Sequence, residues 1–123
     1  MADSRDPTLR VTMLPRDTNA HGTIFGGIIL SHIDLAGAIA ASRQAPRNFV
    51  TRAMREVGFI APVYVGDVVS FYTYVLREGK TSVTIQVIVE AERTKEPRRD
   101  VKVTEAEVVY VAVDEGGNPI PIR

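Results

Sequence analysis

The chain of 123 residues contains no cysteine, which excludes a disulfide framework, a thiol nucleophile and a cysteine-ligated metal site. It also has no excess charge of either sign, since Lys plus Arg and Asp plus Glu are each 15. Balanced charge argues against a general nucleic-acid-binding role and against electrostatic attachment to a membrane. The longest apolar segment is too short and too interrupted to span a bilayer. We therefore expect neither nucleic acid nor membrane as a partner.

The first residues lack the apolar core of a secretion signal, because MADSRDPTLR is polar and charged. A cytoplasmic location is therefore expected. Residues 1–8 are predicted to be a flexible N-terminus, and residues 9–121 a single domain. The hydrophobic content of 45% is sufficient for one compact core in a domain of this length.

The chain is organised around the stretch from Asp17 to Ser42, where a polar turn leads into an apolar segment with one carboxylate, Asp34, near its middle. We predict a buried helix over residues 24–43, because apolar side chains cover most of its circumference and something must surround them. Stepping from Asp34 by three or four residues reaches a strip of small residues: Gly27, Ser31, Ala38 and Ala41. A ligand or a second chain can approach the carboxylate along this strip.

Five segments predict strands, from period-two alternation or from β-branched and aromatic content: residues 9–14, 49–60, 67–77, 81–92 and 101–114. Tight connections, such as the turn Glu78-Gly79-Lys80, imply antiparallel pairing. We therefore predict an α+β fold, with an antiparallel sheet of about five strands wrapped around one long central helix. Apolar residues on both faces of residues 67–77 predict that a second copy of the chain covers this surface.

Several motifs together resemble one known family. The string Asp17-Thr-Asn-Ala-His-Gly-Thr-Ile-Phe-Gly-Gly, with Asp34 seven residues after Gly27, is similar to the hotdog-fold acyl-CoA thioesterases, in particular the YciA-like branch. Further matches follow in the same order: Phe59, Pro62, Val65-Gly66-Asp67, Gly79-Lys-Thr-Ser82 and Thr104-Glu-Ala106. The resemblance extends over nearly the whole chain, and the combined spacing is far more specific than any single piece.

This resemblance implies the hotdog fold and hydrolysis of acyl-CoA to free acid and CoA at a dimer interface. No cofactor is implied, because CoA is part of the substrate and product. The dimers are expected to form by edge pairing into a continuous sheet and to assemble into a hexamer, a trimer of dimers. By the same resemblance Asp34 is the general base or the nucleophile, and Asn19 reaches the site from the facing subunit.

The residues themselves favour the same chemistry, with alternatives. Gly26 and Gly27 at the helix entry would offer free backbone amides to a developing oxyanion, or they would simply permit close packing. Asp34 lies in an apolar helix, where an unpaired buried carboxylate is costly and needs a reason. That reason is either catalysis or a structural ion pair with an arginine.

Basic residues at strand ends ordinarily interact with solvent, but they would also hold the phosphates of CoA. Gly79 and Ser82 resemble the family's positions around the CoA pantetheine and diphosphate, and we extend that role to Arg77, Lys80 and Thr81. The second basic tip, Arg93 to Arg99, is a weaker candidate.

The two histidines suggest no competing site. His32 lies two residues before Asp34 and so faces elsewhere on the helix, which argues against a dyad and against a hotdog dehydratase. We expect His32 in the core or an interface, and His21 in the polar turn. Two histidines without a ligand cluster predict no metal site. The alternative to a hydrolase is a non-catalytic acyl-CoA-binding or regulatory hotdog protein.

Overall fold

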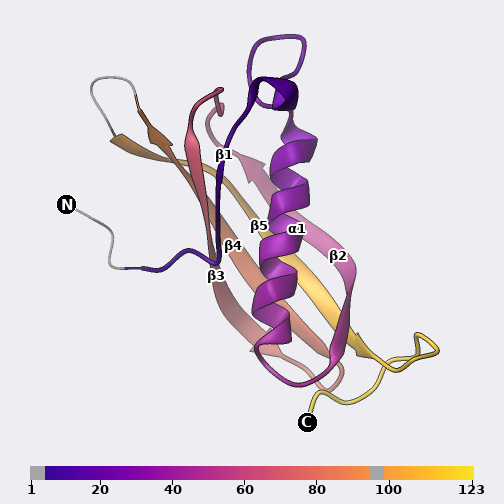
Figure 1. Cartoon of the computed structure of the whole chain (residues 1–123). Helices are drawn as coiled ribbons and strands as arrows, with labels where there is room; N and C mark the ends of the chain where they lie inside the picture. Colours follow the sequence, from indigo (N-terminus) through magenta and orange to yellow (C-terminus); the bar gives the residue numbers. More distant parts are fainter. Residues whose placement is uncertain (1–4, 95–98) are drawn as a thin grey trace.

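The computed structural model describes residues 5–94 and 99–123. A single helix lies across the concave face of one sheet (Figure 1). In chain order the elements are β1 (Leu9–Thr12), the 3-10 turn η1 (Pro15–Asp17), α1 (Gly26–Ser42), β2 (Asn48–Phe59), β3 (Val68–Glu78), β4 (Ser82–Arg93) and β5 (Arg99–Val113). No helix among these described residues is long and apolar enough to cross a membrane.

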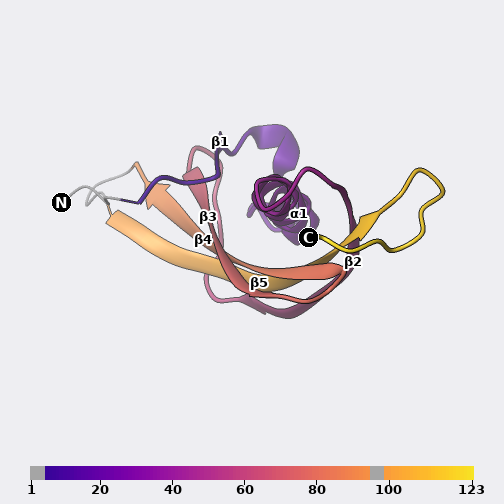
Figure 2. The ribbon, with the colours of Figure 1, turned by 90° about the horizontal axis from the view of Figure 1, so that it is seen from below.

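The sheet has the order β1-β3-β4-β5-β2, and every neighbouring pair is antiparallel. Seen along α1, the sheet curves around the helix (Figure 2). The predicted α+β fold, a five-stranded antiparallel sheet wrapped around one helix, is therefore confirmed. The strands that flank α1 in sequence, β1 and β2, form the two edges of the sheet.

The core lies between the concave face of the sheet and one side of α1, which contacts β2, β3, β4 and β5. The alternation predicted for β4 is confirmed, since its four inward residues, Val83, Ile85, Val87 and Val89, are each 0% exposed. Burying one such side chain contributes about 1.5–3 kcal/mol. The opposite side of α1 is uncovered in a single chain, where Leu35 is 51% exposed. The sheet therefore covers one side of the helix, and the opposite side is open to a second chain or a ligand.

Two predicted element boundaries shift for local reasons. The helix begins at Gly26 rather than residue 24, because Ile24 is extended and its amide donates to the Val63 carbonyl at 2.8 Å. The first strand ends at Thr12, since Pro15 opens the 3-10 turn. The imperfect alternation in residues 49–60 reflects irregularities in β2, where pairing with β5 shifts register twice. Glu56, at the second shift, has a left-handed backbone with φ of 55°.

The prediction that both faces of residues 67–77 are covered holds for half of that strand. Residues 69–72 of β3 are buried, whereas Tyr74, Val75 and Leu76 are 39%, 45% and 41% exposed in one chain.

The expected flexible segment, residues 1–8, stays a prediction, and residues 1–4 lie outside the described residues. The Arg5 guanidinium forms an ion pair with Glu90 at 2.8 Å and lies 3.9 Å from the centroid of the Tyr72 ring. The Thr8 amide donates to the Phe71 carbonyl at 2.9 Å. Chain contacts with β3 and β4 therefore begin upstream of the predicted domain boundary.

Candidate functional site

Asp34 projects from α1 toward β2 and β5 and is half-buried. Its Oδ1 accepts a hydrogen bond from the Thr51 hydroxyl at 2.7 Å and another from the Tyr110 phenol at 3.1 Å. The phenol also lies 2.8 Å from the backbone carbonyl oxygen of Asp34. Asp34 is therefore neither unpaired nor fully buried, because two neutral hydroxyls hold it at a partly open position. Among the described residues, no arginine forms the ion pair with Asp34 that the structural alternative proposed.

The Tyr110 side chain is fully buried, at 0% exposure. Burial raises the pKa of its phenol above the usual range, and the neighbouring Asp34 carboxylate raises that pKa further. The phenol is therefore protonated at any working pH and is a permanent hydrogen-bond donor to Asp34. Within the described residues, no hydrogen bond reaches Oδ2 of Asp34, so that oxygen is available for chemistry.

Gly26 and Gly27 are the first two residues of α1, two positions nearer to the helix start than in the predicted helix over residues 24–43. The first amides of a helix have no intrahelical acceptor, so these two can donate to an incoming oxygen. Close packing is present as well: a Cβ on Gly26 would lie 3.3 Å from the Phe59 ring, and one on Gly27 would lie 2.6 Å from the Phe25 ring. The two interpretations of these glycines are compatible, because small size lets rings approach without blocking the amides.

The loop before α1 is organised by Asn19. Its Oδ1 accepts hydrogen bonds from the backbone amides of His21 at 2.8 Å and Thr23 at 3.2 Å, and its Nδ2 donates to the Thr23 hydroxyl at 2.8 Å. The Phe25 amide donates to the Asp17 carbonyl at 2.8 Å, which ties this loop to the helix start. Asn19 therefore shapes the loop within one chain, as expected of a short polar side chain in a turn.

An apolar cavity of about 290 Å³ opens beside the helix start. Its lining residues come from the helix entry, the end of β2 with the loop that follows it, and β5: Ile24, Gly26, Ile29, Phe59, Ile60, Ala61, Pro62, Val63 and Thr104. The hydroxyl of Thr104 is buried and has no hydrogen-bond partner in the part of the chain that the structure describes. This volume is near the lower end for ligand pockets and suits a short apolar group.

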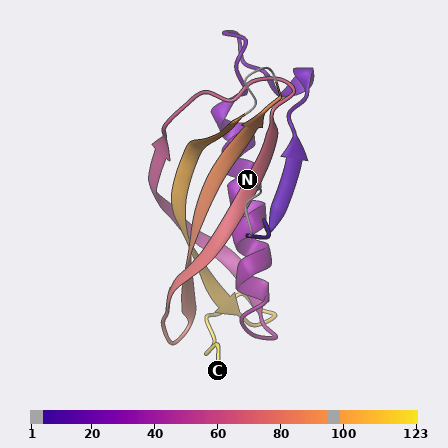
Figure 3. The same cartoon turned by 90° about the vertical axis from the view of Figure 1, so that its left-hand side faces the viewer.

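The β3–β4 hairpin, which carries the predicted CoA-binding residues, lies beside the C-terminal tail. The Ile122 amide donates to the Lys80 carbonyl at 2.9 Å, and the Gly79 amide donates to the Ser82 carbonyl at 2.7 Å. Arg77 is exposed, with Nη2 3.8 Å from Glu107 Oε1, and Thr81 accepts from the Ala112 amide. The hairpin and the loop preceding α1 lie at opposite ends of the molecule (Figures 1 and 3).

One chain does not bring all predicted site residues together. Gly27 and Asp34 are seven residues apart on one helix, which separates their backbones by about 10 Å. Asp34 bonds to Thr51 near the start of β2, whereas Gly26 lies against Phe59 at the end of that strand. The free amides and the carboxylate therefore lie toward opposite ends of β2.

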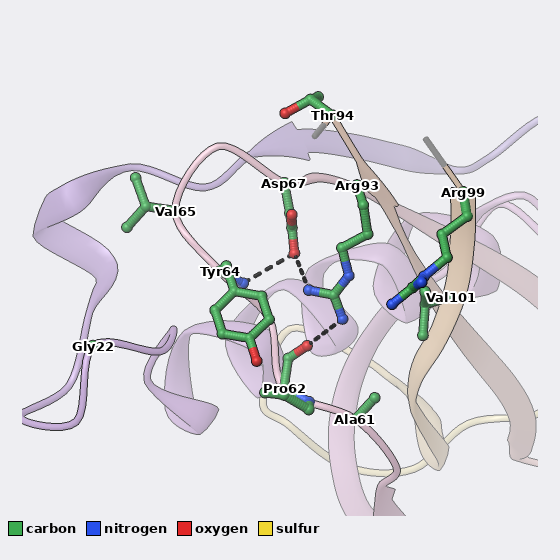
Figure 4. Close-up of a pocket in the computed structure, with 10 residues that line it drawn as sticks. All are labelled: Gly22, Ala61, Pro62, Tyr64, Val65, Asp67, Arg93, Thr94, Arg99 and Val101. Carbon is green, nitrogen blue, oxygen red and sulfur yellow. Dashed lines mark hydrogen bonds and ion pairs between the residues drawn. The ribbon is translucent and has the colours of Figure 1, made fainter. Parts of the chain in front are cut away.

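A larger cavity, of about 720 Å³, lies between the Asn19 loop, residues 61–67 and the facing ends of β4 and β5 (Figure 4). Inside it, Arg93 forms an ion pair with Asp67 at 2.8 Å and donates to the Pro62 carbonyl at 2.7 Å. The Arg93 guanidinium also lies 4.8 Å from the centroid of the Tyr64 ring. The Arg93 side chain is only 14% exposed, so the interpretation of the Arg93 to Arg99 tip as solvated charge is wrong for Arg93. Residues 95–98 of the tip lie outside the described residues.

The histidines occupy the positions expected of them. The His32 ring stacks on Phe71 at 5.8 Å between centroids, and its Nδ1 lies 2.8 Å from the Ile28 carbonyl oxygen. It therefore faces β3, away from the side of α1 that presents Asp34. His21 is exposed in the loop before the helix. Among the described residues, no group of three His, Asp or Glu side chains could hold a metal ion.

Sequence reasoning missed Thr51 and Tyr110. Tyr110 carried a usable signal, because it is a phenol on the inward side of an alternating strand, where a buried hydroxyl needs a partner. Thr51 carried none, since a threonine in an edge strand is ordinary.

The chain is similar to known proteins over most of its length. The sequence model of the Thioesterase superfamily matches residues 21–97. The acyl-CoA thioester hydrolase YciA of Escherichia coli strain K12 is 43% identical over 116 residues, which are 93% of this chain and 88% of that protein.

Two solved structures superpose with a TM-score of 0.92. One is a hexameric hotdog fold thioesterase of Campylobacter jejuni, 44% identical, covering 99% of this chain and 93% of that one. The other is an aspartate-to-alanine mutant of a hexameric broad specificity acyl-coenzyme A thioesterase, 40% identical, covering 96% and 86%. These likenesses confirm the predicted hotdog fold and the family resemblance.

Proposed function

Because the chain belongs to the thioesterase superfamily, we propose that it hydrolyses acyl-CoA to a free acid and CoA at a site shared by two subunits. The observation that supports this most strongly is Asp34, a carboxylate held by two hydroxyls with one oxygen left open. The geometry of a single chain supports the sharing, since the amides of the helix start are too far from Asp34 to act on the same carbonyl group.

A two-fold axis near the middle of β2 would complete the site. β2 is an edge strand, with Asp34 bonded near its start and Gly26 packed at its end. Antiparallel pairing of two β2 strands places the start of one strand opposite the end of the other. Asp34 of one subunit then approaches Gly26, Gly27 and the Asn19 loop of its partner, and the two sheets become continuous.

The same pairing would cover apolar residues that one chain exposes. On β2, Val50 is 48% exposed and Val57 is 39% exposed. A trimer of such dimers, like the hexamers of the similar thioesterases, would provide cover for the exposed half of β3. Light scattering should therefore find an oligomer, and a folded monomer at micromolar concentration would contradict this part of the proposal.

In the proposed reaction, the amides of Gly26 and Gly27 donate to the thioester carbonyl oxygen as negative charge develops there. Oδ2 of Asp34 either takes a proton from water or attacks the carbonyl carbon itself. In the first route the hydroxide oxygen bonds to that carbon, the C–S bond breaks, and the thiolate of CoA leaves and takes up a proton. In the second route Oδ2 bonds to that carbon, the C–S bond breaks, and the thiolate of CoA leaves and takes up a proton. Water then hydrolyses the mixed anhydride to the free acid and restores the Asp34 carboxylate.

Other surfaces of the protein would bind the acyl chain and the CoA part of the substrate. The cavity of about 290 Å³ beside Gly26 would take a short acyl chain. The hairpin residues Arg77, Gly79, Lys80, Thr81 and Ser82 would hold the pantetheine and phosphates of CoA, since their cations are exposed. Asn19 would help orient the carbonyl or water in the partner's site. Hydrolysis by these groups requires no cofactor, and we propose a cytoplasmic location, where acyl-CoA is found.

The test is thiol release from a panel of acyl-CoA substrates, measured on wild type and on Asp34→Asn. Release by the wild type that depends on Asp34 supports the hydrolase. Binding of acyl-CoA without release would favour the alternative, a regulatory hotdog protein that only senses the ligand.

A further inference from the structure

Tyr110 makes two contacts with the same residue on a different element. Its phenol oxygen lies 2.8 Å from the Asp34 carbonyl oxygen and 3.1 Å from Oδ1 of the Asp34 carboxylate. The one phenol proton is shared between these two acceptors, so the hydroxyl links β5 to the helix backbone and also to the Asp34 side chain. Packing alone does not account for this arrangement, because a phenylalanine would fill nearly the same volume.

The helix is shaped to receive this hydroxyl. Gly37 lies three residues after Asp34, on the same side of α1. A Cβ at position 37 would overlap the Tyr110 hydroxyl and would lie 3.0 Å from two carbons of its ring. Glycine is a poor helix former, costing about 1 kcal/mol relative to alanine in a helix interior. Its presence in the middle of α1 therefore has a local reason, which is to admit the phenol.

The contacts are unevenly shared between the two carboxylate oxygens. Thr51 and Tyr110 both direct hydroxyls at Oδ1, and among the described residues nothing bonds to Oδ2. A carboxylate turns easily about its last torsion, whose preferences are broad. Thr51 donates fully to Oδ1 at 2.7 Å, and Tyr110 shares its one proton between Oδ1 at 3.1 Å and the Asp34 carbonyl oxygen at 2.8 Å. Together they restrict that rotation and leave the other oxygen at a defined position.

We propose that Tyr110 is a positioning residue that, seated against Gly37, fixes the Asp34 carboxylate so that Oδ2 alone faces the reacting group. The proposal rests on the proposed hydrolase function of Asp34. Tyr110 does not touch the substrate in this account. It raises the fraction of molecules in which the Asp34 carboxylate is oriented for reaction. This matters because misplacement of a reacting group lowers the rate.

The test is steady-state thiol release by Tyr110→Phe, which keeps the ring and removes the hydroxyl. We expect kcat to fall about tenfold with KM unchanged, because the fixed orientation of the Asp34 carboxylate is lost while the substrate-binding surfaces remain. Tyr72→Phe is the matched control: Tyr72 is also a buried tyrosine, on β3, but it lies outside the site. That control should keep the wild-type kcat.

A second variant tests the close contact between Gly37 and the Tyr110 hydroxyl. Gly37→Ala should displace the phenol, so it should lower both the melting temperature and kcat. In the double variant Gly37→Ala with Tyr110→Phe, removal of the hydroxyl should recover part of the melting temperature but none of the kcat lost in Tyr110→Phe. A role in packing alone would instead restore both together. Gly37→Ala also keeps the proposal testable if Tyr110→Phe does not fold.

The outcomes separate this proposal from the proposed function. Wild-type kcat in folded Tyr110→Phe, with Asp34→Asn inactive, would overturn the positioning role and leave the hydrolase intact. Raised KM with unchanged kcat would assign Tyr110 to substrate binding and would also overturn it. Full activity in Asp34→Asn, or no thiol release by the wild type, would refute the proposed function and the positioning role with it.

Discussion

Asp34 and Asp67 are two carboxylates held in different ways. Asp67 is 5% exposed and accepts hydrogen bonds from the Tyr64 amide at 2.9 Å and from the Arg93 guanidinium at 2.8 Å. Asp34 is half-buried, and two neutral hydroxyls bond to one of its oxygens. The first carboxylate is paired with a cation, whereas the second accepts hydrogen bonds from neutral hydroxyls and, among the described residues, has one oxygen without a partner. We therefore propose a structural role for Asp67 and a role in the reaction for Asp34.

Asp34→Asn should have the largest effect of these variants, and the effect should be on kcat rather than on stability. The amide keeps the volume of the carboxylate but can neither take a proton from water nor attack a carbonyl, so kcat should fall about a hundredfold or more. The melting temperature should not fall, because functional carboxylates often reduce stability. Thiol-release kinetics and thermal melts check both points, and a melting temperature that falls together with activity would assign Asp34 a structural role.

Asp67→Asn should show the reverse pattern. Removing one partner of a buried ion pair leaves Arg93 without its counter-charge, and we expect the free energy of unfolding to fall by about 3 kcal/mol. Activity per folded molecule should change little, since the Asp67 side chain bonds to Tyr64 and Arg93 and to none of the proposed catalytic residues. Urea unfolding combined with kinetics on the folded fraction measures both quantities. A loss of kcat with unchanged stability would place Asp67 in the site instead.

The cations provide a third contrast. Arg93 forms an ion pair with Asp67, whereas Arg77 and Lys80 are exposed on the β3–β4 hairpin. Replacing Arg77 and Lys80 by alanine should raise KM severalfold and change kcat little, because they would bind a remote part of the substrate equally in ground and transition states. Added salt should raise KM for the wild type in the same way. Unchanged KM and kcat in the variants would show that Arg77 and Lys80 do not bind the CoA phosphates. Arg99, which lines the larger cavity, would then be the next candidate.

Thr104 should give the smallest effect. Its buried hydroxyl has no partner among the described residues, in contrast with the hydroxyl of Tyr110. Thr104→Val keeps the shape and removes the unpaired group, so the free energy of unfolding should rise by about 1 kcal/mol. Chemical denaturation measures this change. A loss of stability would show that the hydroxyl is bonded in the assembled protein.

The fold was largely predictable because its signals are local. Alternation along β4 and the apolar stretch before Ser42 each lie within one element, and short turns imply antiparallel pairing. Asp34 was identifiable from the sequence as a candidate, because it is a charge on an apolar helix. Its partners were not, since Thr51 is 17 residues away and Tyr110 is 76 residues away in the sequence.

Arg93 shows the same limit. Its charge at the end of a strand predicted contact with solvent, and only the fold brings it against Asp67, 26 residues earlier. Contacts between distant elements depend on register and on the curvature of the sheet, which local patterns do not specify.

We propose that Asp34 of one subunit acts with Asn19 and the helix start of its partner. Co-expression of Asp34→Asn with Asn19→Ala chains tests it directly, because a hybrid dimer would contain one site with both changes and one site with neither. If Asn19→Ala alone lowers kcat about tenfold, the mixture should exceed the mean of the two parent variants about fivefold. Activity equal to that mean would show that the two residues act within one chain and would contradict the account.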